Sequence, residues 1–334
     1  MKANDLAEKL LKACGNPLAS IYSNSKHSDK LNGCLHSDIN ILNVACSGKW
    51  DGGLCYGITI IAGPSRHFKT GLALNFLKSF QEQYENGICI FLDSELGSGI
   101  SYMENIGIDT DKVIHIPIKD IEEAKFQTVK ILDSLEEDDK LFILYDSIGN
   151  TASKKELEDA QNEKSVADMT RARAIKSYFR IITPLINLNK VYFVGINHTY
   201  QTMDFISKEV MSAGQGPLLS ADTVFFMGRS QEKDNSGITG YNFKLKVHKS
   251  RFVREGSVFP LNISFEEGID KYSGLLELAL EHGIVSKPSK VSYCRKGDEN
   301  DKWSLSKITR NDEFWKPIIE DEEFKLWVER KFSI

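Results

Sequence analysis

The sequence lacks the long apolar run of a membrane-spanning helix. None of its hydrophobic stretches approaches the roughly 20 residues that cross a bilayer. The first residues, MKANDLAEKLLKACGN, mix acidic residues with leucines, which indicates an amphipathic helix and not a secretory signal. We therefore expect a cytoplasmic protein with no membrane partner.

Paired cysteines and an excess of positive charge are also missing. The formal net charge is −5, which argues against a protein coated in positive charge but leaves room for a local basic groove. The six cysteines form no C-x-x-C pair and have no histidine at zinc-finger spacing, so we expect reduced thiols. They are Cys14, Cys34, Cys46, Cys55, Cys89 and Cys294.

What the sequence does contain is an alternation of apolar runs and helix-length stretches. Near-continuous runs of Ile, Leu, Val and Phe are typical of parallel strands buried on both faces. Such runs occupy residues 56–63, 87–95, 140–147 and 190–198. Helical stretches are expected at residues 69–84, 98–107, 120–137 and 168–188. The pattern predicts an α/β core over residues 36–270, after a helix and linker at 1–35 and before a helical, charged region at 271–334.

Polar residues stand where these predicted strands end. The second run ends in Asp93, Ser94 and Glu95, the third in Asp146 and Ser147, and the fourth in Asn197 and His198. Because the carboxyl ends of parallel strands lie at one edge of an open sheet, these clusters should converge on one site.

The first predicted strand runs into the loop GPSRHFKT, residues 63–70. It has the opening glycine and closing Lys-Thr of a phosphate-binding loop, but Phe68 stands where glycine is usual before the lysine. We expect Phe68 to fit only with a negative φ and with its ring pointing away from the phosphates. A plain strand–turn–helix connection is the alternative, and the acids at the neighbouring strand ends favour the nucleotide site.

Glu95 is the candidate general base, because phosphate-ester hydrolysis needs a carboxylate that orients the attacking water. The alternative for Glu95 is an acid near a helix N-terminus without a role in function. Asp93 is expected to support the site and not to act in it.

These motifs together resemble RecA-type recombinases, most closely their phage branch, the UvsX recombinases of T4-like viruses. The resemblance rests on GPSRHFKT, FLDSELGSGISYMENIGID, LYDSIGNTASKKE and GINHTY, and it covers residues 40 to 285. It implies a RecA-like P-loop ATPase core with a mainly parallel sheet flanked by helices, a short N-terminal helix and a small C-terminal α-rich region. The phage branch also carries an aromatic residue before the loop lysine.

The resemblance also implies an ATP and Mg²⁺ site. Lys69 would bind phosphate, Thr70 and Asp146 would hold Mg²⁺, and Glu95 would be the catalytic base. Tyr102 would stack on adenine, with a buried helix tyrosine as the alternative. His198 stands where RecA has a glutamine that senses the γ-phosphate, a departure that leaves this chemistry open. The residues expected to bind nucleotide are Gly63, Pro64, Ser65, Arg66, His67, Phe68, Lys69, Thr70, Gly71, Tyr102 and Asp146.

In this family two cations complete the ATP site of the neighbouring subunit. Lys249 and Arg251 of KVHKSRFVRE stand at the corresponding places. Positive charge supplied in trans stabilises the transferring phosphate. The alternative is an exposed edge strand whose lysines prevent aggregation.

Two long polar loops, at residues 150–167 and 199–218, are candidates for DNA contact. Tyr200 and Phe205 could stack on bases, and Gly214 and Gly216 would let the second loop reorder. A solvated helix face is the alternative for each of the basic residues that could follow a phosphate backbone. These are Lys154, Lys155, Arg171, Arg173, Lys176 and Arg180.

The resulting hypothesis is a DNA-dependent ATPase that forms filaments on single-stranded DNA and pairs it with homologous double-stranded DNA, in the host cytoplasm of a phage. The N-terminal helix, with Leu6 and Leu10, and the linker residues Ile21 and Tyr22 would contact a neighbouring subunit or, alternatively, cap their own core. Recombination mediator and single-strand-binding proteins are further expected partners. A hexameric helicase of the same fold and a non-hydrolysing single-strand-binding scaffold are the alternatives.

Overall fold

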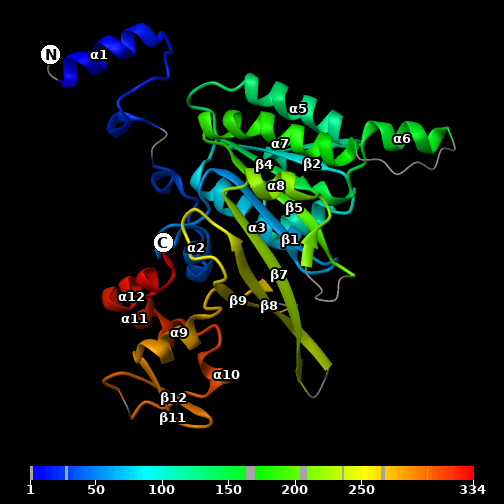
Figure 1. Cartoon of the computed structure of the whole chain (residues 1–334). Coiled ribbons are helices and arrows are strands. Elements are labelled where there is room, and N and C mark those ends of the chain that lie inside the picture. The colour runs from blue at the N-terminus through cyan, green and yellow to red at the C-terminus, as the bar shows by residue number, and fades with distance from the viewer. Residues whose placement is uncertain are drawn as a thin grey trace.

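The computed structural model describes residues 3–26, 29–162, 170–203, 209–234, 237–264, 268–298 and 300–334. Its centre is a ten-stranded sheet in the order β10-β9-β8-β7-β1-β5-β4-β2-β3, with β6 paired to β5 (Figure 1). The strands are β1 Gly57–Gly63, β2 Ile88–Asp93, β3 Val113–Pro117, β4 Leu141–Asp146, β5 Tyr192–Gln201, β6 Glu209–Met211, β7 Thr223–Asp234, β8 Gly237–Lys249, β9 Val258–Ser264 and β10 Gly268–Ile269.

The sheet has a parallel part and an antiparallel part. The strands from β7 through β1, β5, β4 and β2 to β3 pair in parallel. Beyond β7, the strands β8, β9 and β10 continue as an antiparallel meander. The expected α/β class is confirmed, and the four strands expected from the apolar runs are β1, β2, β4 and β5.

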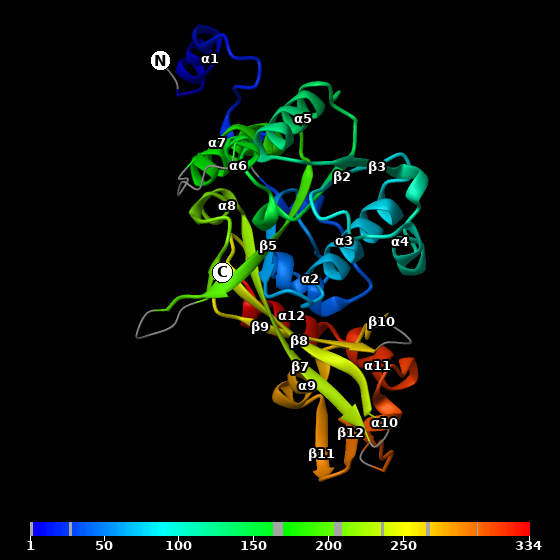
Figure 2. The same ribbon diagram turned by 90° about the vertical axis from the view of Figure 1, so that its right-hand side faces the viewer.

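Helices cover both faces of the parallel part because its strands are apolar on both sides. Leu72, Phe76 and Phe80 of α3 pack in one buried cluster with Phe91 and Phe142 of the sheet. The other face packs against α5 and α7, which lie on the opposite side of the sheet in Figures 1 and 2. The helices before the C-terminal region are α1 Ala3–Cys14, α2 Asn40–Ser47, α3 Lys69–Gln83, α4 Ile100–Ile106, α5 Ile121–Asp133, α6 Lys154–Gln161, α7 Thr170–Leu188 and α8 Gln215–Ser220.

The two predicted DNA loops are not entirely loops. Residues 154–161 form α6, which starts at a capping box between Ser153 and Glu156. Within 199–218, β5 continues to Gln201, and β6 and the start of α8 follow. The expectation of two structureless segments is therefore wrong for these parts. Residues 163–167 and 204–208, which include Phe205, lie outside the described residues.

The C-terminal region contains a β-hairpin as well as helices. Its elements are α9 Leu275–His282, β11 Val285–Ser289, β12 Ser292–Arg295, α10 Leu305–Ile308, α11 Asp312–Ile319 and α12 Glu322–Phe332. Phe332 of α12 packs on Phe259 of β9 at 4.6 Å, and Phe324 packs on Trp50 at 5.6 Å. Aromatic contacts therefore hold this region against β9 and against the segment that follows α2.

The N-terminal helix α1 lies away from the sheet (Figures 1 and 2). The connecting segments that the structure describes include the short 3₁₀ helices η1 Tyr22–Asn24, η2 Leu31–Gly33, η3 Thr110–Lys112 and η4 Ile148–Asn150. No helix in the described ranges combines the length and apolar character needed to cross a bilayer.

Candidate nucleotide-binding site

The strand ends converge at the carboxyl edge of the parallel sheet. In the strand register, Gly63 of β1 lies beside His198 of β5, and Asp93 of β2 lies beside Asp146 of β4. A cavity of about 160 Å³ opens there. It is lined by residues 65–71, Glu95, Tyr102, Asp146, Ile196 and His198.

The phosphate-binding loop ends at the first turn of α3. Four N–H groups at a helix start have no partner within the helix, so this turn offers donors to an anion. Lys69 begins α3 and is buried, with 6% exposure, and its Nζ donates to Pro64 O at 2.8 Å. Burial lowers the pKa of Lys69, while the nearby carboxylates of Asp146 and Glu95 act in the opposite direction. A buried cation beside free N–H donors is suited to a polyphosphate.

Phe68 adopts the left-handed conformation, with φ 57° and ψ 21°. The expectation of a negative φ is therefore wrong. Glycine is usual here because it adopts positive φ without cost, and this chain accepts the strain with a large side chain. The ring extends toward β8, where it packs on Phe243 with 5.7 Å between centroids. It also fills the space above Gly71, since a Cβ there would lie 2.4 Å from the ring.

Thr70 and Asp146 form the pair expected to hold a metal ion. The Thr70 hydroxyl donates to Asp146 Oδ2 at 2.7 Å. Burial raises the pKa of Asp146 to about 6, and the charges of Glu95 and Asp93 contribute to the rise. Hydroxyl and carboxylate oxygens are ligands that Mg²⁺ prefers, and a cation would offset the cost of this buried charge. The donor set therefore fits Mg²⁺.

Glu95 is held through a single oxygen. Its Oε1 accepts hydrogen bonds from Ser147 Oγ at 2.6 Å, Asn150 Nδ2 at 2.7 Å and His198 Nε2 at 2.9 Å. Burial by itself would raise the pKa of Glu95, but the bonds from Ser147 and His198 outweigh it, so the pKa lies below its ordinary value. Glu95 is thus a carboxylate in a fixed orientation.

Asp93 supports the turn that carries Glu95. Its Oδ1 accepts from the N–H groups of Glu95 at 3.0 Å and Leu96 at 2.7 Å. Its Oδ2 lies 3.0 Å from His115 Nε2. Ser147 was expected at this strand end, but without a role of its own. Asn150 was not singled out; it ends η4, four residues after Asp146, and its place in the segment after the strand was the available signal.

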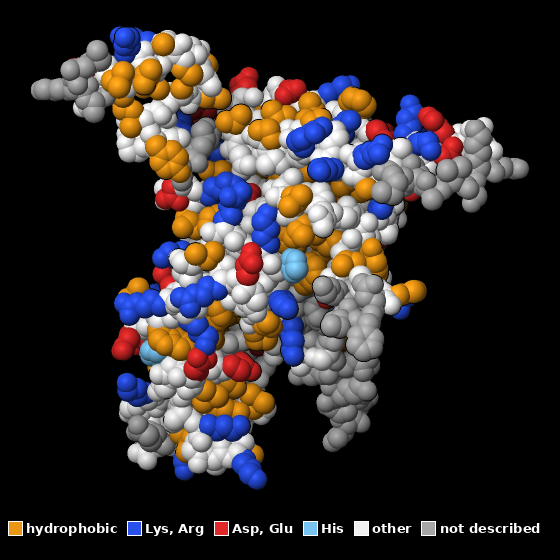
Figure 3. Space-filling view, viewed as in Figure 1, with side chains coloured by type: hydrophobic (Ala, Val, Ile, Leu, Met, Phe, Trp, Pro, Cys, Tyr) orange, Lys and Arg blue, Asp and Glu red, His pale blue; other side chains and the backbone are white. Residues whose placement is uncertain are grey.

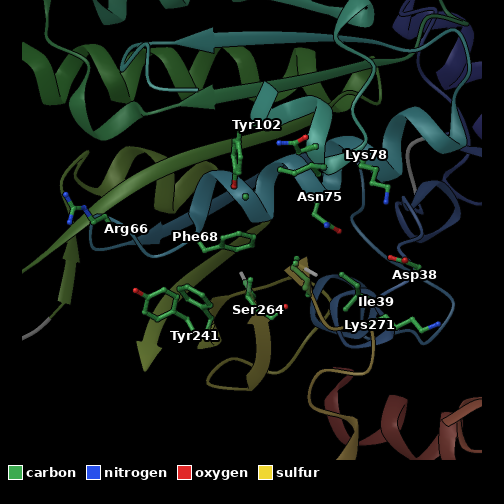
Figure 4. Close-up of a pocket in the computed structure, with 17 residues that line it drawn as sticks. Asp38, Ile39, Arg66, Phe68, Asn75, Lys78, Tyr102, Tyr241, Ser264 and Lys271 are labelled. Atoms are coloured by element: carbon green, nitrogen blue, oxygen red, sulfur yellow. The ribbon is translucent and has the colours of Figure 1, made fainter. Parts of the chain in front are cut away.

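Tyr102 lines the small cavity and also a larger one of about 950 Å³ beside it. Figure 4 shows Tyr102 on one side of this space, the Phe68 ring in the middle and Tyr241 on the far side. Tyr102 has 42% exposure, so it is not the buried helix tyrosine of the alternative reading. The larger cavity shares residues with the small one and adds an aromatic lining.

Lys249 is the last residue of β8 and Arg251 follows two residues later, away from the carboxyl ends of the parallel strands. Lys249 pairs with Val224 of β7, which pairs with Ile60 in β1, upstream of the phosphate-binding loop. Lys249 Nζ donates to the carbonyls of Leu218 at 2.9 Å and Leu219 at 3.0 Å.

Arg251 Nε donates to Asp222 Oδ1 at 2.6 Å, and the Asp222 side chain also accepts from the N–H of Ile58 near the start of β1. Neither cation is placed to reach the phosphate-binding loop of its own chain.

Three of the basic residues that were expected to follow a phosphate backbone lie on α7. Arg173, Lys176 and Arg180 are exposed there, and Figure 3 shows blue side chains gathered over α7 and the neighbouring α6. Lys155 pairs with Asp159 at 3.2 Å, and Lys154 begins α6 beside it. Exposed cations on one face can follow a phosphate backbone.

Arg171 differs from the other basic residues of this helix. Its guanidinium donates to the carbonyls of Gly149, Thr151 at 2.8 Å and Ser212 at 3.3 Å. Arg171 therefore joins the start of the first candidate DNA segment to Ser212, which lies within the second. A contact between Arg171 and phosphate stays a prediction. Tyr200 is 56% exposed, as a stacking residue requires.

Comparison with known proteins agrees with this geometry. Residues 32–270 match the family model of the RecA N-terminal domain. The chain belongs to the RecA family. Residues 272–328 match the C-terminal domain of the bacteriophage T4 recombination and repair protein.

Individual relatives cover most of the chain. The recombination and repair protein of Enterobacteria phage T4 is 41% identical over 340 residues, covering 99% of this chain and 86% of that protein. Protein RecA of Ruegeria pomeroyi and of Kineococcus radiotolerans are each 28% identical over 253 residues, covering 74% of this chain and 70% of each relative. The expected membership of the RecA family and its phage branch is confirmed.

Proposed function

We propose that this RecA-family chain is a recombination and repair ATPase of phage origin, which assembles on single-stranded DNA and pairs it with a homologous duplex. The observation that carries the proposal is the small cavity in which Lys69, Thr70, Glu95 and Asp146 meet. Such a set combines an anion cradle, two oxygen ligands for a cation and a carboxylate base.

Each of these side chains has a separate role in ATP hydrolysis. Lys69 and the first turn of α3 bind the β- and γ-phosphates, and Thr70 with Asp146 would hold Mg²⁺. The bound Mg²⁺ supplies charge neutralisation at the phosphates. Since Glu95 Oε1 already accepts three hydrogen bonds, Oε2 is the atom that orients the attacking water.

The nucleoside binds beside the loop, in the larger cavity. Tyr102 offers a half-exposed aromatic face to the base. Phe68 and Tyr102 line both cavities, so the base and the phosphates would bind in adjoining spaces beside one loop.

Lys249 and Arg251 act on the neighbouring subunit. Their place away from the chain's own loop supports action in trans, because each chain then presents its phosphate-binding loop at one side and two cations at the other. An assembly that repeats this contact without closing is a filament.

The exposed apolar residues of the N-terminal segment support the same assembly. Leu6 and Leu10 on α1 are 46% and 58% exposed, and Tyr22 in the linker is 77% exposed. In a filament these residues would pack on the next subunit, and burying them is favourable. Mediator and single-strand-binding proteins are proposed as further partners.

DNA binds where α7 and the segments after β4 and β5 meet. Arg173, Lys176 and Arg180 contact phosphates, and Tyr200 stacks on bases. Contacts of this kind tolerate any sequence, as pairing of arbitrary homologous strands requires.

Phosphate release measured with and without single-stranded DNA tests the ATPase. Lys69→Ala should abolish turnover, whereas the matched variant Lys130→Ala, on an exposed position of α5, should retain it. Unchanged turnover in Lys69→Ala would show that the site is wrong. Absence of DNA-stimulated turnover in the wild type would favour the single-strand-binding scaffold.

Electron microscopy with ATP and single-stranded DNA tests the assembly. Open filaments are expected. Closed rings, together with unwinding of forked duplexes, would favour the hexameric helicase.

A further inference from the structure

Two cysteines face each other beside a short antiparallel bridge near the start of the core. Leu35 and Leu54 exchange both backbone hydrogen bonds, with N···O distances of 2.8 Å and 3.1 Å. The pair next to such a hydrogen-bonded pair is a non-hydrogen-bonded pair, whose Cα atoms lie only about 4.5 Å apart and whose side chains lie on one face. In this chain, that adjacent pair is Cys34 and Cys55.

The two thiols are each other's neighbours. Hydrogen bonding to Cys34 is the largest cause of a raised pKa at Cys55, followed by burial. Cys34 has extended backbone and lies half-buried, whereas Cys55 is 7% exposed. A small oxidant can therefore reach the thiol of Cys34, while the thiol of Cys55 is buried beside it.

We propose that Cys34 and Cys55 are a site of reversible oxidation, at which a peroxide forms an intramolecular disulfide. The expected Cα separation falls within the roughly 4.4–6.8 Å that a disulfide spans, so the bond needs little backbone movement. Both cysteines also lie in segments joined by backbone hydrogen bonds, which keeps them in register.

The reaction balances with peroxide as the oxidant. Cys34, as the thiolate, attacks one peroxide oxygen, which gives a sulfenic acid and one water. The Cys55 sulfur then attacks the sulfenic sulfur, forms the S–S bond and releases a second water. Two thiols lose two electrons and two protons, and one peroxide is reduced to two waters.

The disulfide would link the end of the N-terminal segment, at Cys34, covalently to the core at Cys55. Cys34 Sγ donates to the carbonyl of Lys30 at 3.8 Å, and Lys30 Nζ lies 2.9 Å from Asp222 Oδ2. Asp222 also binds Arg251. Oxidation would therefore restrain the linker near Asp222, the carboxylate that binds Arg251. The disulfide would close a loop of chain that contains α2.

Peptide mapping tests the pairing directly. The full chain is treated with hydrogen peroxide, free thiols are blocked, and the protein is digested with trypsin without reductant. Cleavage after Lys30, Lys49 and Arg66 places Cys34 with Cys46 in residues 31–49 and Cys55 in residues 50–66. We expect these two peptides to be linked, and dithiothreitol to separate them.

Two variants identify the partner. Cys34→Ser should abolish the linked peptide, and Cys46→Ser should keep it. A link that persists in Cys34→Ser would assign the bond to Cys46 and overturn the proposal. A sample in which exposed Cys14 is oxidised but no link forms would also overturn it.

Thermal unfolding gives a second measurement. Closing a loop between these cysteines should raise the Tm of the oxidised wild type by several degrees, and dithiothreitol should reverse the shift. Peroxide-treated Cys34→Ser should show no such reversible rise. A reversible rise of the same size in Cys34→Ser would exclude this pair as its cause.

Discussion

Replacing Phe68 with alanine and with glycine should separate two effects at this unusual position. Phe68 combines a strained backbone, with φ at 57°, with a ring packed on Phe243 and Gly71. Both substitutions remove the ring. Only glycine also removes the strain, because it has no Cβ.

The magnitudes follow from these contacts. Losing a partly buried phenylalanine ring costs about 2 kcal/mol of unfolding free energy. The left-handed conformation costs an alanine about 1–2 kcal/mol, a cost that glycine avoids. The greater entropy of glycine in the unfolded state destabilises the glycine variant by about 0.4–1 kcal/mol, which offsets part of this advantage. We therefore expect Phe68→Ala to be destabilised by about 2 kcal/mol and Phe68→Gly by only about 1 kcal/mol.

Urea unfolding of the wild type and both variants measures these differences. Phe126 provides a matched control, because it is 62% exposed within α5, where the backbone is helical. At that position alanine should be more stable than glycine by about 1 kcal/mol. If alanine were at least as stable as glycine at position 68 too, the positive φ and the strain argument would be refuted.

Three further outcomes are expected. Gly149→Ala should lower the Tm and DNA-stimulated turnover, because the new Cβ would lie 2.4 Å from Ser212 Oγ. Arg171→Gln should destabilise the chain by about 2 kcal/mol in urea unfolding, since it leaves buried carbonyls without donors. Asp146→Asn should abolish Mg²⁺-dependent phosphate release yet stabilise the metal-free fold at pH 7. Folding raises the pKa of Asp146 from 3.8 to about 6, so the metal-free wild type loses folding stability as the pH rises through that range. Measuring the urea midpoint of the wild type at several pH values checks the sign.

The parts of the fold that the sequence predicted are those with a local signal. Strands β1, β2, β4 and β5 are continuous apolar runs because both of their faces are buried. Edge strand β3 was missed, since it is short and no residue in it is fully buried. The helix α6 was read as a loop because its sequence, KKELEDAQ, is short and mostly polar, and its clearest signal was the capping box.

The site was predicted as a set of strand ends, but its contacts were not. Parallel topology alone brings Glu95, Asp146 and His198 to one edge. The roles of Ser147 and Asn150, the left-handed Phe68 and the three carbonyl contacts of Arg171 depend on side-chain directions across the sheet. Residue spacing along the chain does not encode these directions.

The contacts of Glu95 give a physical reason why DNA binding would alter hydrolysis. Asn150 stands at the start of the first candidate DNA segment and His198 at the start of the second, and both donate to the same oxygen of Glu95. Arg171 fixes the carbonyls on either side of Asn150 and that of Ser212 in the second segment. DNA that moves Asn150 or His198 would therefore change a hydrogen bond to the carboxylate that we propose as the base. A displacement large enough to break one such bond suffices, so no rearrangement of the sheet is needed to couple the two sites.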